Sequence, residues 1–468
     1  MTDATDRGAT DRGRLSRGLK AAFLDTMRKA PTGAKPSRAG AVARAGRHDT
    51  SFESLPAYRE MRTQRALADT LAIDFPFYRV HDARAGSRSI IGGKPVVNFA
   101  SYDYLGLNGH ADITKAVVDA VGTWGTSVSA SRITAGERDF HRDLERALAD
   151  NYDADDALVF VSGHATAVST IAALLGPKDL ILHDALIHNC VVVGAQLSGA
   201  TRRPFPHNDL DALRESLAAT RDRFERVLVV VEGLYSMDGD GPDLARLVEI
   251  KDDFDCWLMV DDAHALGVLG ATGRGIFETT GVDPKRVDIW LGTLSKTLVS
   301  CGGYVAGSHV LIEYLKLAAP GMVYSVGLPA PAAVAALTAM TLMRQEPERV
   351  ARVQANGRLF LSRAVEAGLD VGPSWGYAIT PVVIGDSLRT ILLAERLLAR
   401  GFNACPIIPP GVPEQSARLR FFISSEHTDA EIAGAVAATR EELTRLEGER
   451  VSLGMLSKLI VAKMKPAG

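Results

Sequence analysis

The chain has 468 residues, of which 46% are hydrophobic and 23% charged, so it is long enough to form two or three globular domains. A formal net charge of −3 argues against nucleic-acid binding, which usually needs a concentrated basic surface. Four scattered cysteines form no CxxC pair and no apolar run approaches the roughly 20 residues of a membrane span, so we expect a cytoplasmic protein without a disulfide framework or a zinc site.

The two ends of the chain differ from the rest in composition. Residues 1–55 are rich in Arg, Ala, Gly, Thr and Asp and are expected to form a disordered N-terminal extension. Residues 449–468 mix Leu, Ile, Val and Met with lysines and form an amphipathic basic tail. Either end could give weak peripheral contact with the inner membrane surface, although packing of the tail on the protein body is an equal alternative.

The segments between these ends predict three parts. Residues 56–100 are expected to form a helix, which Pro76 stops, and then a β-hairpin. Residues 101–340 alternate buried strands with helices, which predicts a large domain with a mostly parallel sheet covered on both faces. Residues 341–448 alternate helices with short strands and predict a smaller C-terminal α+β domain.

A lysine in an apolar segment is the most informative residue of the predicted sheet domain. Lys296 lies in DIWLGTLSKTLVSCGG (residues 288–303), directly after Ser295 and close to Thr293. Most lysines lie on solvated faces, but this segment is too apolar for an open surface. Since a desolvated amine loses its proton more easily, Lys296 is a candidate nucleophile.

Acidic residues and a histidine follow the buried strand predicted at 257–260. Asp261 and His264 come at its carboxyl end, where open α/β sheets bind ligands. An aspartate at one strand end and a lysine after the next strand suit pyridoxal 5'-phosphate (PLP). The lysine holds the aldehyde as a Schiff base, and the aspartate keeps the ring nitrogen protonated. The sequence therefore indicates a PLP site.

A second junction suits the phosphate of such a cofactor. Ser162, Gly163 and His164 stand where the strand predicted at 157–161 gives way to a helix. Free backbone N–H groups and the positive helix end form a natural phosphate seat at this kind of junction. Because strand–glycine–helix junctions are common, this feature supports the cofactor only in combination with Lys296 and Asp261.

Seven motifs in order, spread over roughly residues 57–442, resemble those of the α-oxoamine synthases, which are PLP enzymes of the fold type I aminotransferase superfamily. These motifs are NFASYDYLGL, GTSVSASR, HDALIHN, EGLYSMDGD, DDAHALGVLG, GTLSKTLVSCGG and ARLRFFISSEHT. The family includes 8-amino-7-oxononanoate synthase, 5-aminolevulinate synthase, glycine C-acetyltransferase and serine palmitoyltransferase. The resemblance implies a fold type I PLP-dependent transferase with a large sheet domain and a smaller C-terminal α+β domain.

The resemblance also implies a role for each matching catalytic residue. Lys296 matches the Schiff-base lysine, which also moves the α-proton of the substrate. Asp261 matches the partner of the ring nitrogen, and His264 matches the hydrogen-bond donor to the phenolic oxygen of the ring. His188 matches the histidine that stacks on the ring, although alone it would fit a buried structural histidine equally well.

The remaining cofactor residues follow from the same motifs. Ser236 matches a hydroxyl near the cofactor. Thr293 and Ser295 match phosphate-side positions, and the backbone amides of Gly163 and His164 complete the phosphate seat.

Three residues are expected to bind the substrates. Arg420 matches the arginine that grips the carboxylate of the amino acid, a task that suits a bidentate guanidinium. Tyr102 and Ser131 are the other substrate-binding candidates.

Four positions depart from the family pattern. Tyr102 stands where glycine-using members usually carry Asn, a difference typical of serine palmitoyltransferase and of polyketide-associated members. His164 replaces the Phe or Tyr that commonly follows the glycine in this family. Val326 replaces a hydroxyl that reaches the phosphate of the neighbouring subunit in many members. Ile408 stands where the biotin enzyme would offer a basic residue, which disfavours a pimeloyl thioester.

The predicted reaction is the decarboxylative condensation of an amino acid with an acyl thioester, which gives an α-amino ketone. Serine with a long acyl chain is the first expectation, as in the first step of sphingolipid-type long-chain base synthesis. The alternatives are a polyketide-pathway synthase that uses glycine or alanine, and an 8-amino-7-oxononanoate synthase-like enzyme. Coenzyme A and an acyl carrier protein are both open as the carrier of the acyl group, and the resemblance implies a homodimer.

Other classes of protein fit the sequence less well. A catalytically inactive partner subunit would lack the lysine, whereas Lys296 is present. A transcription regulator built on an aminotransferase-like body would need a DNA-binding module, which residues 1–55 cannot encode. A plain aminotransferase or a carbon–sulfur lyase is the more remote enzymatic alternative.

Overall fold

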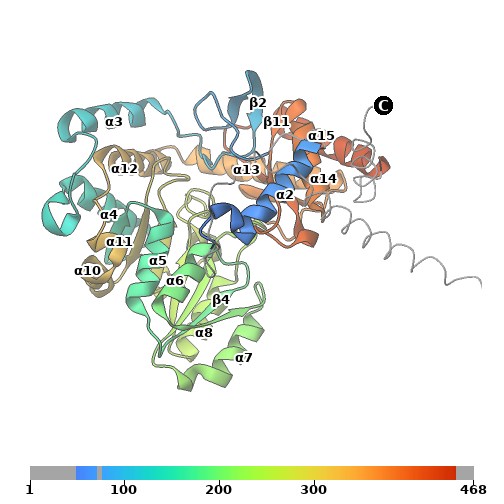
Figure 1. Cartoon of the computed structure of the whole chain (residues 1–468). Helices are drawn as coiled ribbons and strands as arrows, with labels where there is room; N and C mark the ends of the chain where they lie inside the picture. Colours follow the sequence, from blue (N-terminus) through green and yellow to red (C-terminus); the bar gives the residue numbers. More distant parts are fainter. Residues whose placement is uncertain (1–48, 71–75, 450–468) are drawn as a thin grey trace, which may run out of the picture. The chain divides into compact units, whose positions relative to one another are not determined.

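The computed structural model describes residues 49–70 and 76–449 (Figure 1). The chain divides into two compact units, of which one comprises residues 1–75 with 446–468 and the other residues 76–445. In the first unit the structure describes η1 (Phe52–Ser54) and α2 (Pro56–Thr70), and α2 corresponds to the predicted N-terminal helix. Most of the predicted extension and nearly all of the predicted basic tail lie outside the described residues.

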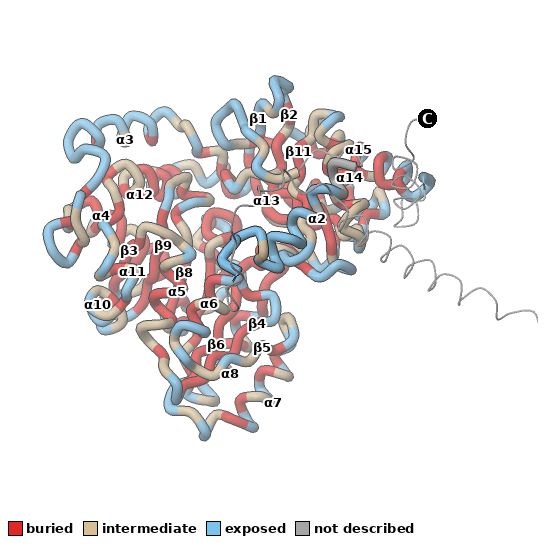
Figure 2. The backbone as a smooth tube through the Cα atoms, in the orientation of Figure 1, coloured by how far each residue is buried: buried red, intermediate tan, exposed pale blue. Residues whose placement is uncertain are grey.

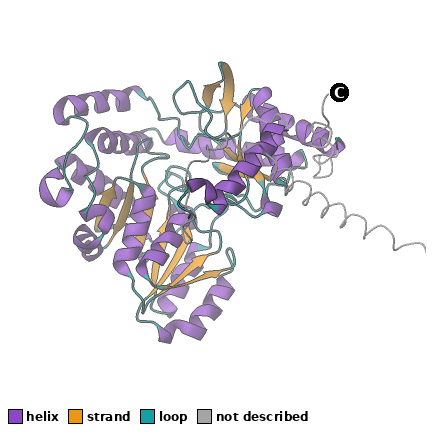
Figure 3. Cartoon of the chain, in the orientation of Figure 1, coloured by secondary structure: helices purple, strands orange, loops and turns teal. Residues whose placement is uncertain are grey.

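A seven-stranded sheet forms the centre of the second unit (Figures 1 and 3). Its strands are β3 (Asp156–Phe160), β4 (Leu180–Asp184), β5 (Thr201–Phe205), β6 (Val227–Glu232), β7 (Trp257–Asp261), β8 (Ile289–Thr293) and β9 (Gly303–Gly307). They lie in the order β3-β9-β8-β7-β6-β4-β5. Neighbouring strands are parallel except for the pairs that β9 makes with β3 and β8.

The sequence of β6 shows why such strands form. VLVVVE is an uninterrupted apolar run that ends in a glutamate, and every residue of it is buried. Successive side chains of a strand point to opposite faces, so Val229 and Val231 join one hydrophobic core, while Leu228 and Val230 join the other. A strand covered on both faces needs this continuous apolar pattern.

Helices cover both faces of the sheet, and the buried strands lie between them (Figure 2). The first face is covered by α4 (Asp139–Asn151), α7 (Leu210–Thr220), α8 (Leu244–Asp253), α9 (Ile276–Thr280) and α12 (Ala330–Gln345). The second is covered by α5 (Gly163–Leu174), α6 (Asn189–Ser198), α10 (His309–Ala318) and α11 (Pro320–Val323). A further helix, α3 (Ala111–Trp124), packs on α12.

The C-terminal part is smaller and mixes helices with antiparallel strands. Its elements are α13 (Pro347–Glu366), β10 (Ile379–Val383), α14 (Ser387–Ala399), β11 (Phe402–Asn403), β12 (Cys405–Ile407), β13 (Arg418–Phe422) and α15 (Asp429–Gly448). Strands β10, β13 and β12 form an antiparallel sheet in that order. The large, mostly parallel sheet and this smaller part confirm the predicted fold class.

A third small sheet joins the predicted hairpin to the C-terminal part. The hairpin strands β1 (Arg88–Ile91) and β2 (Lys94–Asn98) are antiparallel, and β11 pairs with β2 in parallel. The Asn403 side-chain amide donates to Asn98 Oδ1 at 2.8 Å. The segment that leads into NFASYDYLGL is therefore held against the strands that precede β13. Among the described residues, no helix combines the length and apolar character needed to cross a bilayer.

Candidate active site

Two buried carboxyl groups occupy adjacent positions at the carboxyl edge of the parallel sheet. Asp261 ends β7, Glu232 ends β6, and the two residues are partners in the strand register. Asp261 Oδ1 accepts a hydrogen bond from the Ala263 N–H at 3.1 Å, and Glu232 Oε2 accepts one from the Ser236 N–H at 3.1 Å. This edge is where open α/β sheets bind their ligands.

Lys296 follows β8, the strand next to β7, and its side chain is half-buried. Its amine lies close enough to Asp261 and Glu232 for both carboxyl charges to act on it. Removal from water lowers the pKa of Lys296, and negative charge on Asp261 or Glu232 opposes this shift. Burial raises the pKa of Asp261, while Lys296 and His188 oppose that shift. An amine with a lowered pKa opposite a buried acid can act as a nucleophile toward a carbonyl group.

His188 stands at the same edge, at the start of α6. It caps this helix, because its Nδ1 accepts a hydrogen bond from the Cys190 N–H at 3.3 Å. Asp261 and Lys296 both act electrostatically on its ring, so the three side chains lie near one another. The ring is exposed in the single chain, which leaves a face against which a planar ligand can stack.

His264 lies in an aromatic enclosure. The Tyr104 hydroxyl and His264 Nδ1 are 2.7 Å apart and hydrogen bonded, and both side chains are buried. Burial lowers the pKa of His264 well below its usual value, so the ring is neutral. The Phe422 ring lies parallel to it at 6.2 Å, and the Tyr102 ring lies edge-on at 6.1 Å. Lys296 Nζ is 5.9 Å from the centroid of the Tyr102 ring, so Tyr102 borders the lysine.

Arg420 approaches this group of residues from β13. Its Nη1 donates to the Ser236 carbonyl oxygen at 3.0 Å, and its guanidinium lies 4.5 Å from the centroid of the Phe422 ring. Within the described residues, Arg420 Nε and Glu232 Oε1 are buried without a hydrogen-bond partner. An unpaired buried polar atom is costly in free energy. These two atoms therefore indicate that a polar ligand completes the site.

The predicted phosphate seat lies at the start of α5. Ser162 caps this helix, because its Oγ accepts a hydrogen bond from the Ala165 N–H at 3.3 Å. Thr293 Oγ1 is 2.8 Å from Ser295 Oγ. A Cβ atom on Gly163 would lie 2.9 Å from Thr293 Oγ1, so only glycine allows this close approach. The two hydroxyl groups thus lie beside a helix N-terminus, which is a set of donors that suits a phosphate.

Two of the predicted site residues stand apart from this group. Ser131 bonds within its own loop, where its Oγ lies 3.1 Å from Thr134 Oγ1 at the π-helical turn η2 (Arg132–Gly136). His164 is exposed, and only its charge connects it to the site, through His188. The roles that the sequence predicts for Ser131, His164 and the other site residues described above stay predictions.

Glu232 is the residue that the sequence analysis missed. It is the first residue of the EGLYSMDGD motif, in which only Ser236 is predicted to lie near the cofactor. The signal that could have found it is its position as the last residue of an apolar strand, one strand away from the strand that ends in Asp261.

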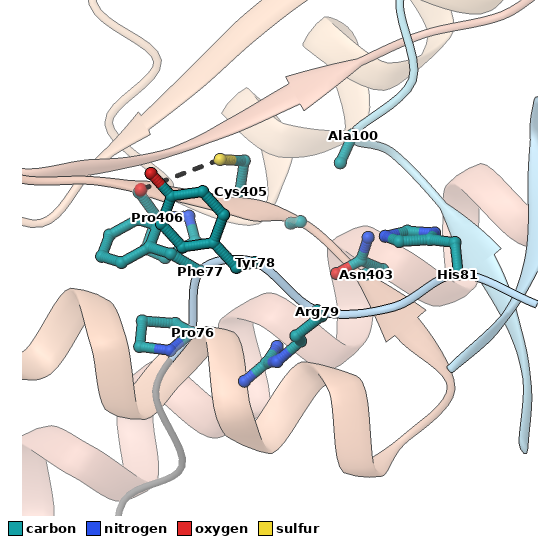
Figure 4. A pocket seen from close by; sticks show the side chains of 10 residues that line it. Pro76, Phe77, Tyr78, Arg79, His81, Ala100, Asn403, Cys405 and Pro406 are labelled. Atoms are coloured by element: carbon teal, nitrogen blue, oxygen red, sulfur yellow. Dashed lines mark hydrogen bonds between the residues drawn. The ribbon is translucent and has the colours of Figure 1, made fainter. Parts of the chain in front are cut away.

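A pocket of about 530 Å³ is lined in part by β12, the strand that pairs with β13 (Figure 4). Its walls come from the segment 76–81, from Ala100 and from residues 403–406. Cys405 in this wall is the register partner of Arg420, and the Arg420 charge acts on its thiol. Most of the lining is apolar. The guanidinium of Arg79 is ion-paired with Glu395, and both side chains are largely buried.

Comparison with known proteins identifies the family. Residues 94–438 match the family model for aminotransferase class I and II. The 8-amino-7-oxononanoate synthase of Methylococcus capsulatus is 39% identical over 374 residues, which is 80% of this chain and 96% of that protein. The chain belongs to the α-oxoamine synthases. Within this family it is a PLP-dependent C-acyltransferase, as the sequence predicted.

Solved structures agree on the fold of this synthase. A serine palmitoyltransferase from Sphingomonas wittichii matches with a TM-score of 0.80 and 26% identity, over 84% of this chain and 98% of that one. A serine palmitoyltransferase with its PLP internal aldimine matches with the same TM-score and coverage at 27% identity. The curated relatives are named for a different product, so they favour the 8-amino-7-oxononanoate synthase-like alternative over the serine-using reaction.

The described residues of the synthase fit PLP. An amine with a lowered pKa (Lys296) lies near a buried acid (Asp261), and His188 offers an open ring face. The hydroxyl groups of Thr293 and Ser295 lie beside the start of α5. PLP has an aldehyde, a ring nitrogen, a flat ring and a phosphate, and each of these groups has a counterpart in this set.

Proposed function

We propose that the site around Lys296 catalyses the decarboxylative condensation of an amino acid with an acyl thioester. The observation that supports this most is the combination of a half-buried lysine near Asp261 with an arginine whose buried Nε has no partner among the described residues. The lysine and the acid suit the cofactor. The unpaired guanidinium nitrogen of Arg420 suits a carboxylate, which an amino-acid substrate brings.

Each residue then has a defined task. Bound PLP supplies an electron sink for the negative charge that develops at the α-carbon of the amino acid. Lys296 Nζ, with its lowered pKa, removes the α-proton as a neutral amine. Asp261 would stabilise a protonated ring nitrogen of the bound cofactor, and Arg420 would hold the substrate carboxylate. The hydrogen bond between Tyr104 and His264 fixes the orientation of the His264 ring.

The curated relatives support one specific pair of substrates. Their product, 8-amino-7-oxononanoate, is a nine-carbon amino keto acid. A decarboxylative condensation forms it from alanine and a seven-carbon acyl group that ends in a carboxylate. Alanine with such an ω-carboxyacyl thioester is therefore the first pair of substrates to test.

The pocket that β12 lines in part favours a second pair, namely serine with a long uncharged acyl chain. Its walls are mostly apolar, and the charge of Arg79 is already neutralised by Glu395. An ω-carboxylate would have to compete with Glu395 for this guanidinium, whereas a hydrocarbon end would not. The overall similarity to serine palmitoyltransferases supports the same pair.

The experiment supplies each amino acid with each acyl thioester and measures release of the free thiol and carbon dioxide. We expect both products in equal amounts with one of the two pairs, and neither from the Lys296→Ala variant. Acyl groups carried by coenzyme A and by an acyl carrier protein form separate arms. Formation of transamination products without free thiol would overturn the proposal in favour of a plain aminotransferase.

Assembly and location extend the same proposal. We expect a homodimer in the cytoplasm, with a mass in solution of twice the 50.0 kDa chain. Peripheral contact with the inner membrane surface is a further expectation, and vesicle sedimentation of the full chain measures it. A monomer that turns over both substrates would contradict the expected assembly while leaving the reaction intact.

A further inference from the structure

Glu232 is a buried acid for which the reaction above has no use. Its side chain is at the centre of the site, and the residue is only 3% exposed. Oε2 accepts a hydrogen bond from the Ser236 N–H, and the backbone N–H of His188 lies close enough to lower the pKa of the carboxyl group. Glu232 therefore connects the two segments that present His188 and Ser236 to the site.

The neighbouring carboxyl group makes a second negative charge costly. Asp261 is the register partner of Glu232 on β7, so two carboxyl groups lie side by side away from water. Like charges in such a place cannot both ionise easily, and one of the pair keeps its proton.

The surroundings of the two acids differ, and the difference shows which one keeps the proton. Asp261 has the Ala263 N–H and the charge of Lys296 to stabilise its ionised form. Glu232 has one oxygen, Oε1, without a partner among the described residues. Burial and the charge of Asp261 raise the pKa of Glu232 to about 8, although Ser236, Lys296 and His188 act in the opposite direction.

We propose that Glu232 is a positioning residue that stays a neutral carboxylic acid at neutral pH, so that Lys296 faces the single negative charge of Asp261. A second carboxylate would stabilise the ammonium form of Lys296, and only the neutral amine is a nucleophile. Ionisation of Glu232 in alkaline solution therefore weakens the site.

The groups that face Glu232 come from several elements. They are Asp261 on β7, Lys296 after β8, His188 and Cys190 at the start of α6, and Tyr235 in the loop after β6. Burial raises the pKa of both Cys190 and Tyr235, so these two groups are neutral near pH 8. Asp261, Lys296 and His188 are thus the partners whose charge responds to Glu232.

The first test reads the proton directly, by infrared spectroscopy of the cofactor-free protein at pH 7. We expect a band from a protonated carboxyl group that disappears in Glu232→Gln and persists in Glu225→Gln. Glu225 is a matched control, because it is an exposed glutamate paired with Lys178. Asp262 is a second buried acid, whose pKa burial raises to about 8, so it contributes its own band. Asp262→Asn removes that second band, and the absence of any protonated-carboxyl band in this variant would overturn the proposal even if Glu232→Gln failed to fold.

The second test uses the thermal unfolding of the cofactor-free protein as a function of pH. A carboxyl group whose folded pKa is raised stabilises the fold below its unfolded pKa, and this contribution is lost as pH rises through the folded value. For Glu232 the window runs from about 4.5 to about 8. We expect the melting temperature of Glu232→Gln relative to the natural protein to rise by a few degrees across this window and then level off.

A merely structural role gives a different result. If Glu232 only holds its two neighbouring segments, the difference in melting temperature stays constant with pH, and the proposal fails. The neutral state of Glu232 rests on the proposed function of this site, but both tests use cofactor-free protein without turnover. They can fail while thiol release succeeds, and they can succeed while thiol release fails.

Discussion

Two groups of buried charges lie in the large sheet domain, and they differ in how completely they are paired. In the first, Arg132 donates from Nε to Glu137 and from Nη1 to Glu145, both at 2.5 Å. Arg142 then joins Glu145 at 2.8 Å to Asp156 at 3.2 Å. Each guanidinium and carboxyl group of this network finds a partner. In the second, the site group of Lys296, Asp261, Glu232 and Arg420, two buried polar atoms have none among the described residues.

The difference separates structural from functional charges. A buried charge with all its partners in the chain connects elements, as Arg132 connects the turn η2 with α4. A buried charge with missing partners raises the energy of the empty site, and a ligand recovers that energy when it binds. Changes in the first group should therefore affect stability, and changes in the second should affect chemistry.

The largest expected effect is on the chemical side. Asp261→Asn removes the charge that we propose stabilises the ring nitrogen, and we expect thiol release to fall by ~10³-fold or more while the protein stays folded. Steady-state kinetics and circular dichroism measure the two quantities. Asp262→Asn is the matched control, because the Asp262 carboxyl group bonds to Tyr152 in the sheet interior at 3.2 Å. An equal loss of thiol release in Asp261→Asn and Asp262→Asn would contradict the assignment of Asp261, and not Asp262, to the site.

On the structural side, Arg132→Met removes the guanidinium that Glu137 and Glu145 share and leaves the buried Glu145 with Arg142 as its remaining guanidinium partner. Breaking such a buried pair costs about 3–5 kcal/mol of unfolding free energy, which chemical denaturation measures. The cofactor absorbance per folded molecule should not change. Arg146→Met on α4 removes an exposed pair with Asp143 and should cost no more than about 1 kcal/mol. Loss of turnover at full stability in Arg132→Met would place this network in the site.

A smaller effect is expected at the substrate carboxylate. Arg420→Lys keeps the charge but loses the planar fork, so kcat/KM for the amino acid should fall about 10–100-fold, mostly through KM. Arg418→Lys tests the neighbouring arginine, which pairs with Asp238 at 2.6 Å. An unchanged KM in Arg420→Lys would remove Arg420 from substrate binding.

The smallest effect concerns the support of His264. Tyr104→Phe deletes one buried hydrogen bond, which is worth about 1 kcal/mol, and should weaken PLP binding by a few-fold. Tyr152→Phe deletes a similar buried hydroxyl in the sheet interior and should lower stability without a change in PLP affinity. Titration of the cofactor absorbance distinguishes the two variants. Identical PLP affinities in Tyr104→Phe and Tyr152→Phe would show that the hydrogen bond to His264 does not contribute to PLP binding.

The same contrast explains what could be predicted from the sequence. The strands before Asp261 and Lys296 are continuous apolar runs, so their ends, and the residues on them, follow from local pattern. The sequence does not mark the short strands β11 and β12 or the edge strand β5 individually. Their few residues carry no periodic signal, and pairing with distant strands defines β11 and β12.

Long-range partners account for the other omissions. Whether Arg132 faces the site or a structural network depends on Glu145 and on Asp156, which the fold brings together. The protonation of Glu232 likewise depends on Asp261, a residue 29 positions further along the chain and adjacent only in the sheet. Residue type and spacing cannot supply such contacts.

The most direct test of the account is to identify which residue carries the cofactor. Purified protein loaded with PLP is reduced with borohydride, digested and examined by peptide mass spectrometry. We expect the reduced cofactor on the peptide that contains Lys296, and its loss from that peptide in Lys296→Ala. Attachment to a different lysine, or no covalent attachment at full occupancy, would contradict the assignment of this edge of the sheet as the active site.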